Sequence, residues 1–324
     1  MKEPILSVNN LKVVFRLKDN TNLFAVDDIS YELNEEECLC IVGESGCGKS
    51  VSALSLLKLI DKPGEIVGGK IIYKNINILD ISEKELNKIR GNKISMIFQE
   101  PMTSLNPVFT IGNQLDEMLK IHTDLSKEER KNEIEKILTR VGIADAKNKI
   151  DFYPFQLSGG QCQRVMIAMS ILCKPDILIA DEPTTALDVT IQAQIIKLLK
   201  ELMFTNKMSI IFITHNLGIV SEIGTKIIIM YAGKIMEKTT VDELFKNPAH
   251  PYTIGLLKCV PQLKTPKNEK LFVIPGTVER IKHNINYCRF YNRCYNRKKE
   301  CLEAEPELKK INDNHYVRCF FPIN

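Results

Sequence analysis

The strongest constraint on the fold is one eight-residue run, Gly43-Glu44-Ser45-Gly46-Cys47-Gly48-Lys49-Ser50. It follows an apolar, β-rich segment at residues 38–42 and precedes apolar residues at helical spacing through residue 60. In a glycine-rich loop between a strand and a helix, backbone N–H groups wrap phosphates, a lysine reaches the β and γ oxygens, and a serine hydroxyl binds Mg²⁺. The run therefore predicts a nucleotide site in which residues 43–50 hold the phosphates and Ser50 binds Mg²⁺.

Short β-rich runs alternate with helical patterns through most of the chain, which is typical of an α/β domain with a largely parallel sheet. Further strands are predicted at residues 94–98, 177–180, 209–213 and 226–231. From about residue 101 to residue 160 the β pattern gives way to charged helical sequence, in which Ser126 has the position of an N-cap. We therefore expect a P-loop α/β core with a helical insertion.

A second polar motif stands at the end of the strand predicted at residues 177–180, where Asp181 and Glu182 follow directly. One carboxylate at such a strand end can hold Mg²⁺, and the other can orient or deprotonate the water that attacks the γ-phosphate. We assign Mg²⁺ to Asp181 and the water to Glu182. Because acidic pairs at strand ends are common, this motif alone leaves a purely structural role open.

A third motif, Leu157-Ser158-Gly159-Gly160-Gln161, precedes another helical pattern. With this motif in place, residues 5–251 resemble the ATPase subunits of ABC transporters, because the family's motifs occur here in the family's order. Those motifs are the 43–50 loop, Gln99 after a strand, the 157–161 signature, Asp181-Glu182, the Ala186-Leu187-Asp188 turn, and His215 after a strand. The resemblance implies an ABC-type ATPase core that hydrolyses ATP with Mg²⁺.

The resemblance also implies an ATP sandwich, in which the phosphate loop of one ATPase subunit faces the signature of another. The signature residues then bind the ATP of the partner subunit: Ser158, Gly159, Gly160 and Gln161. The resemblance assigns further roles by motif position. Gln99 binds Mg²⁺ and senses the transport subunit, and Asp188 couples the two sites. Glu182 acts in catalysis together with His215, which steadies the γ-phosphate.

One aromatic ring usually stacks on adenine near the end of the first strand in the family that this chain resembles. Phe15 is the candidate at that position. The stretch at residues 16–22 looks like extra loop length, so Phe24 is an alternative, and either ring can instead belong to the core.

Three separated segments resemble the ATPases of oligopeptide and dipeptide importers: residues 99–107, 181–190 and 247–253. This resemblance implies an ATPase domain over residues 1–248, with a helical subdomain at about 101–160, and a C-terminal extension over residues 249–324. It implies uptake of peptides as the function. Nickel importers share this ATPase type, so nickel stays open as an alternative cargo.

Four cysteines, Cys288, Cys294, Cys301 and Cys319, fall in the C-terminal extension. Four thiolates can complete a tetrahedral metal site or hold an iron–sulfur cluster, although the paired spacing of structural zinc sites is missing. Nearby basic residues are expected to favour the thiolate forms: Arg289, Arg293, Arg297, Lys298 and Arg318. Resemblance to the peptide-importer extension implies a [4Fe-4S] cluster, while zinc and metal-free thiols remain alternatives.

The composition suggests no nucleic-acid partner, because 44 basic and 40 acidic residues leave a formal charge of only +4. The N-terminal residues carry no secretory signal, and no apolar run reaches the roughly 20 residues that span a bilayer. We therefore expect a peripheral protein on the cytoplasmic face of the cell membrane. The implied partners are a second ATPase subunit, more often a paralogue than an identical copy, two integral membrane permease subunits and, indirectly, an extracytoplasmic peptide-binding protein.

Two rival functions remain open from the sequence. One is a soluble ABC-type ATPase that acts on nucleic acid or ribosomes, although such proteins often carry paired ATPase domains, whereas one set of motifs occurs here. The other is a regulatory or redox-sensing role for the cysteine-rich extension, which would then control the ATPase.

Overall fold

The computed structural model describes residues 3–18, 21–100, 104–184, 188–260, 272–282 and 285–323 of the 324-residue chain. The chain divides into two compact units, one of residues 1–80 with 213–324 and one of residues 81–212. The C-terminal residues thus belong to the same compact unit as the N-terminal ones. The proposed boundary between residues 248 and 249 stays a prediction.

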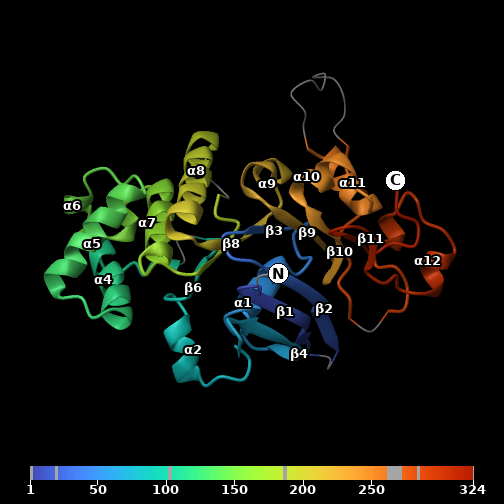
Figure 1. Cartoon of the computed structure of the whole chain (residues 1–324), viewed down its shortest axis with the longest axis horizontal. Helices are drawn as coiled ribbons and strands as arrows, with labels where there is room; N and C mark the ends of the chain where they lie inside the picture. Colours follow the sequence, from blue (N-terminus) through green and yellow to red (C-terminus); the bar gives the residue numbers. More distant parts are fainter. Residues whose placement is uncertain are drawn as a thin grey trace. The chain divides into compact units, whose positions relative to one another are not determined.

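The first unit contains an antiparallel sheet with the strand order β2-β1-β4-β5 (Figure 1). Its strands are β1 (Leu6–Arg16), β2 (Asn22–Leu33), β4 (Gly64–Tyr73) and β5 (Ile76–Asn77). The register shifts between Val8 and Leu11 and again between Val13 and Val14. Such irregularities interrupt the alternation of apolar and polar residues, so the sequence pattern does not predict this sheet, and only the family resemblance implies a first strand ending near Phe15.

A second set of strands in the same unit has the order β11-β12-β10-β9-β3. These are β3 (Cys38–Val42), β9 (Lys226–Tyr231), β10 (Lys234–Thr240), β11 (Lys309–Asn312) and β12 (His315–Val317). β3 and β9 are parallel, and β3 is buried along its whole length, as expected for a central parallel strand. The β11–β12 hairpin, which the sequence analysis did not predict, extends this sheet from the edge of β10.

The helices of the first unit are α1 (Lys49–Ser55), α9 (Leu217–Ile223), α10 (Val241–Lys246), α11 (Pro251–Lys258), α12 (Glu300–Glu303) and the 3₁₀ turn η2 (Tyr291–Arg293). α1 is shorter than the apolar spacing suggests, because the chain turns at Lys58, which has a φ of 52°. α11 starts with proline at its first position, and the ring of His250 accepts a hydrogen bond from the N–H of Tyr252. Both features are strong helix starts.

The second unit contains the parallel strands β6 (Ile94–Ile97) and β7 (Ile177–Asp181), both fully buried. Its helices are α2 (Glu83–Ile89), α4 (Ile111–His122), α5 (Lys127–Arg140), α6 (Ala146–Lys149), α7 (Gly159–Ile171), α8 (Val189–Asn206) and the 3₁₀ turn η1 (Pro154–Gln156). β8 (Ser209–Thr214) crosses the division between the units. These strands confirm the predicted positions.

The charged sequence after residue 104 forms α4 and α5. Ser126 caps α5 as predicted, because its hydroxyl accepts from the Glu129 N–H while the Glu129 carboxylate accepts from the Ser126 N–H. Arg130 of α5 pairs with Asp116 of α4 at 2.6 Å, which joins the two helices. Within the described residues, no helix is both long enough and apolar enough to span a bilayer.

Candidate nucleotide-binding site

The glycine loop leaves β3 and ends at Gly48, which is the N-cap residue of α1. Gly46 and Gly48 have φ values of 80° and 105°, a region that residues with a side chain rarely adopt. A Cβ on Gly48 would lie 2.2 Å from the carbonyl oxygen of Ala25, and one on Gly43 would lie 2.3 Å from that of Met230. The loop path therefore requires glycine for conformation and for close backbone approach.

Lys49 begins α1 and is only 5% exposed. Its ammonium donates to the carbonyl oxygens of Gly43 at 2.7 Å and Glu44 at 3.0 Å. These bonds offset part of the cost of burying the charge. They also hold the cation against the loop, and Ser50 follows it in the first turn of the helix.

In the second unit, Asp181 is the last residue of β7 and is 4% exposed. Glu182 follows with a φ of 46°, in the left-handed region that costs a residue with a side chain free energy. Gln163 of α7 is buried and donates a 2.6 Å hydrogen bond to the carbonyl oxygen of Pro183. Gln163 thus ties the signature helix to the acidic turn. A single glutamine in a helix carries no motif, so the sequence gives no signal for this residue.

The signature motif forms the start of α7. Ser158 is the N-cap, accepting from the Gln161 N–H at 3.3 Å, while the Gln161 side chain accepts from the Ser158 N–H at 3.1 Å. Ser158 and Gly159 are exposed, and a Cβ on Gly159 would meet no atom within 4 Å. The capped helix start, with its positive dipole end, is therefore open to an anion from outside this unit.

The other predicted site residues lie at the ends of strands and helices. Gln99 is exposed two residues after β6, and His215 is exposed directly after β8. Asp188 caps α8 by accepting from the Ile191 N–H at 2.9 Å. The motif positions 101–103 and 185–187 lie outside the described residues.

Both candidate adenine-stacking rings are half-buried in the antiparallel sheet. Phe15, near the end of β1, packs closely on Gly64 of β4, where an added Cβ would lie 2.8 Å from the phenylalanine ring. The Phe24 N–H on β2 donates to the carbonyl of Ile281 at 2.9 Å. The adenine contact stays a prediction for Phe15.

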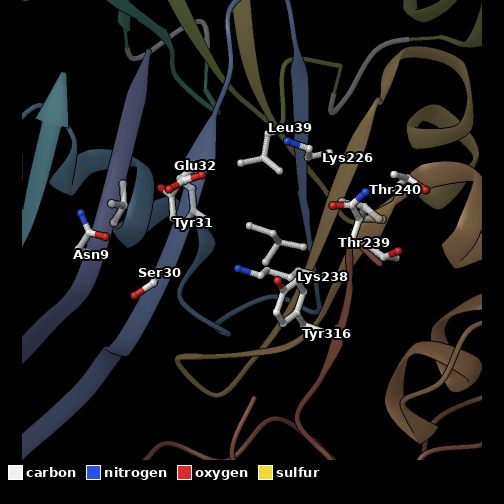
Figure 2. A pocket seen from close by; sticks show the side chains of 14 residues that line it. Asn9, Ser30, Tyr31, Glu32, Leu39, Lys226, Lys238, Thr239, Thr240 and Tyr316 are labelled. Atoms are coloured by element: carbon white, nitrogen blue, oxygen red, sulfur yellow. The ribbon is translucent and has the colours of Figure 1, made fainter. Parts of the chain in front are cut away.

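Figure 2 shows the side chains around a pocket of about 350 Å³ in the first unit. Leu39, the second residue of β3, lines it, whereas the glycine loop follows the last residue of that strand. Several polar and charged side chains surround it: Asn9, Ser30, Glu32, Lys226 and Lys238. This pocket is therefore separate from the phosphate loop, at the other end of β3.

The four C-terminal cysteines line one small cavity of about 10 Å³, together with aromatic rings that include Phe290. His250 lines the same cavity, and its Nε2 is buried without a hydrogen-bond partner of ordinary geometry among the described residues. No three His, Cys, Asp or Glu side chains in the described part of the chain lie close enough to hold a single metal ion. The tertiary structure thus brings together four thiols that are spread over 32 positions of sequence, from residue 288 to residue 319.

The arginines beside these cysteines do not favour the thiolate forms of Cys288 and Cys319, so that expectation is wrong for both. Burial raises the pKa of Cys288 to about 12 and that of Cys319 to about 11. The physical reason is that the guanidinium of Arg289 binds Asp27 and Glu305, while that of Arg318 donates to backbone carbonyl oxygens. Without a metal, both thiols are therefore protonated at neutral pH.

A glycine loop between a parallel strand and a helix, a buried strand that ends in two acids, and a capped Ser-Gly-Gly-Gln helix start define a P-loop ATPase of the ABC class. The ABC transporter family matches residues 26–185, and the oligopeptide/dipeptide transporter C-terminal region matches residues 236–301. The chain belongs to the ABC transporter family and is an ATPase of that family.

Curated relatives match almost the whole length of the chain. The dipeptide transport ATP-binding protein DppD of Escherichia coli is 44% identical over 320 residues, which cover 99% of this chain and 97% of that protein. DppD of Haemophilus influenzae is 46% identical over 323 residues, covering 99% and 96%. Among solved structures, the dimeric ATP-binding cassette MJ0796, bound to ADP and Pi after hydrolysis, is 28% identical with a TM-score of 0.67, covering 73% of this chain and 98% of that one.

Proposed function

We propose that the chain is the ATP-hydrolysing subunit of an ABC importer that energises uptake of oligopeptides or dipeptides across the cell membrane. The observation that carries this proposal is the full-length similarity to two dipeptide transport ATP-binding proteins, which includes the C-terminal region. An ATPase core alone is shared by many kinds of transporter, so the C-terminal region supplies the information about cargo.

In this function, ATP binds the phosphate loop of one subunit and the signature helix of a second ATPase subunit. Residues 43–50 bind the phosphates, and the exposed start of α7, at residues 158–161, completes the γ-phosphate site of the partner. Oxygen donors suit Mg²⁺, which Ser50, Asp181 and Gln99 would hold. Two observations support the pairing of subunits: the open start of α7 and the dimeric form of the similar cassette MJ0796.

The remaining site residues have separate roles in catalysis, in coupling and in adenine binding. Glu182 orients or deprotonates the attacking water, and His215 steadies the γ-phosphate. Asp188, at the start of α8, couples the two sites, while Phe15 stacks on adenine. Catalysis on this scheme consists of positioning and charge stabilisation around a phosphoryl group in transfer.

The proposed partners are a second ATPase subunit, most simply a paralogue, and two integral membrane permease subunits, with a peptide-binding protein outside the membrane. The chain itself would then lie on the cytoplasmic face of the membrane as a peripheral subunit. Closure of the two nucleotide sites and their reopening after hydrolysis would drive the permeases between conformations.

Affinity purification of the tagged chain from solubilised membranes tests this function. We expect two permease subunits and a second ATPase to co-purify, and the linked binding protein to bind peptides in a calorimetric titration. A binding protein that binds Ni²⁺ and no peptide would show that the cargo is nickel instead of peptide. Ribosomes or nucleic acid in place of permeases would overturn the importer assignment altogether.

We also propose that the four cysteines hold a [4Fe-4S] cluster. The donor set fits this group, because four thiols line one cavity. His250 lines the same cavity, and its buried Nε2 has no hydrogen-bond partner of ordinary geometry among the described residues. A cluster is larger than one ion, so its ligands stand further apart than those of a single metal. It is also larger than a cavity of about 10 Å³, so the cavity would have to widen to hold it. The cluster would serve as a structural staple for this small segment.

Anaerobic purification tests the cluster. We expect a brown protein with close to four iron and four acid-labile sulfide per chain, and loss of both in Cys288→Ser. A colourless chain without iron or sulfide would refute the cluster, and stoichiometric zinc in its place would favour the alternative metal. Cys173→Ser, at a half-buried cysteine of the second unit, is the matched control and should keep the iron.

A further inference from the structure

The phosphate loop is held at one residue by three separate contacts. The Glu44 N–H donates to the hydroxyl of Tyr252 at 3.0 Å, and the Glu44 carbonyl oxygen accepts from the Lys49 ammonium at 3.0 Å. The Glu44 carboxylate accepts two hydrogen bonds from the guanidinium of Arg293, at 2.6 and 2.8 Å. Tyr252 and Arg293 both come from the C-terminal segment, so that segment sets the position of the loop residue against which Lys49 rests.

The Arg293–Glu44 pair is partly shielded from water. The side chain of Arg293 is 5% exposed and that of Glu44 is 30% exposed. Arg293 also donates to the carbonyl oxygen of Pro275 at 2.7 Å and lies over the ring of Tyr231 at 5.6 Å. A two-pronged pair of this kind has fixed geometry and is stronger than a single ionic contact. The pair therefore fixes the position of the Glu44 carboxylate.

Arg293 projects from the turn η2, which lies between two of the cysteines. The Tyr291 N–H donates to the Cys288 carbonyl oxygen at 2.9 Å, and the Cys294 N–H donates to the Tyr291 carbonyl oxygen at 3.2 Å. Cys288 and Cys294 line the cysteine cavity. The backbone of both cysteines thus bounds the turn that carries Arg293, while both residues line the cavity.

Tyr252 is connected to the same cavity by ring packing. The centroids of Tyr252 and Phe290 are 5.2 Å apart, and those of Tyr231 and Phe290 are 5.3 Å apart. Phe290 is 2% exposed and lines the cysteine cavity. Because buried rings pack tightly, a displacement of Phe290 would be passed to Tyr252 and hence to the loop.

We propose that Arg293 and Tyr252 are positioning residues for the phosphate loop, and that the cysteine cavity sets the nucleotide affinity of the chain through them. The inference goes beyond the proposed function, because it does not depend on the cargo or on the membrane partners. Its physical basis is that an unpaired Glu44 carboxylate beside the phosphates repels the nucleotide, whereas the pair with Arg293 is neutral.

A double-mutant cycle on the full-length chain tests the contact between Arg293 and Glu44. The quantity measured is the dissociation constant of a fluorescent ATP analogue with Mg²⁺. Arg293→Met should weaken binding about tenfold, because it leaves a like charge beside the phosphates. Glu44→Gln removes that charge, so Arg293→Met should weaken binding much less in the Glu44→Gln background than in the wild-type background.

Lys309→Met is the matched control, since Lys309 is an exposed cation of the C-terminal segment that is not among the residues lining the cysteine cavity. It should bind nucleotide as the wild type does. Wild-type affinity in Arg293→Met would overturn the proposal. An equally large effect of Arg293→Met with and without Glu44→Gln would overturn it too, because Arg293 would then act on the fold without acting through Glu44.

The link to the cavity is tested with Cys301→Ser, whose side chain lines the cavity but does not contact the loop. This change should weaken nucleotide binding about two- to thirtyfold in the wild-type background, the usual range for coupled positions. In the Arg293→Met background its effect should be smaller, because only the route through Tyr252 then remains. An equal effect in both backgrounds would contradict the proposed route. These dissociation constants are measured on the chain alone, so they do not depend on its membrane partners. The importer function and the positioning role of Arg293 and Tyr252 can therefore be refuted independently.

Discussion

ATP turnover by the assembled transporter should fall about 100- to 10,000-fold in Glu182→Gln, while ATP binding is retained. Glutamine has nearly the shape of glutamate, so the turn after β7 keeps its geometry. It cannot accept a proton from the attacking water, and it carries no charge to orient that water. The phosphate-binding residues lie elsewhere, at 43–50, so affinity for the nucleotide should change little.

The measurement uses the complex with its partner ATPase and permeases, because in the proposed function each phosphate loop works with a signature helix from another subunit. Single-turnover hydrolysis and nucleotide binding are measured on the same preparation. Glu201→Gln, an exposed position of α8 in the same unit, makes the same chemical change and should keep full turnover. If Glu182→Gln retained more than about a tenth of the wild-type rate, the role of general base would be wrong.

Loss of the Asp27 carboxylate should lower the free energy of unfolding by about 3–5 kcal/mol, the usual cost of breaking a buried ion pair. Asp27 pairs with the guanidinium of Arg289, which is 2% exposed, and lies 3.4 Å from the ammonium of Lys234. Glu305 accepts from the same two cations, at 2.8 and 3.2 Å. In Asp27→Asn, two buried cations would share one carboxylate.

The pH dependence of stability follows from the same group. Burial alone would raise the pKa of Asp27, but the charges of Lys234 and Arg289 outweigh burial and lower it. A carboxylate with a lowered folded pKa stabilises the protein fully above its unfolded pKa of about 3.9. That contribution is lost as the pH falls through the lower folded value. The wild-type advantage over Asp27→Asn should therefore persist at neutral pH and shrink below about pH 4.

Urea unfolding followed by circular dichroism provides the measurement. Glu65→Gln is the control, because its pair with Arg16 is exposed on both sides, at 53% and 67%. Exposed pairs of this kind contribute about 0–1 kcal/mol. Equal losses in the two variants would show that burial of the Asp27 pair adds nothing to stability.

The nucleotide motifs and most parallel strands could be predicted from the sequence, because their signals are local. A strand, a glycine loop and a helix start are read from consecutive residues, and β3, β7 and β9 show continuous apolar runs. The N-cap at Ser126 was accessible for the same reason. The bulged antiparallel sheet and the β11–β12 hairpin were not, because their alternation is short or interrupted.

Contacts between residues far apart in the sequence are revealed only by the tertiary structure. Arg293 and Glu44 are 249 positions apart, and Arg289 and Asp27 are 262 apart. From the sequence, the arginines beside the cysteines are expected to act on the thiols. In the folded chain Arg289, Arg293 and Arg318 bind carboxylates or backbone carbonyl oxygens elsewhere, since buried guanidinium groups need such partners.

The sequence by itself determined the class of protein, because the chemistry of phosphate binding demands particular residues at short fixed spacings. The Gly43 to Ser50 run already predicts the nucleotide site, since the groups proposed to bind phosphate are consecutive in the chain. Only the tertiary structure decided what holds this loop in place. Its supports, Tyr252 and Arg293, lie in a segment that joins it through sheet extension and ring packing, and such pairing depends on the folded path of the chain.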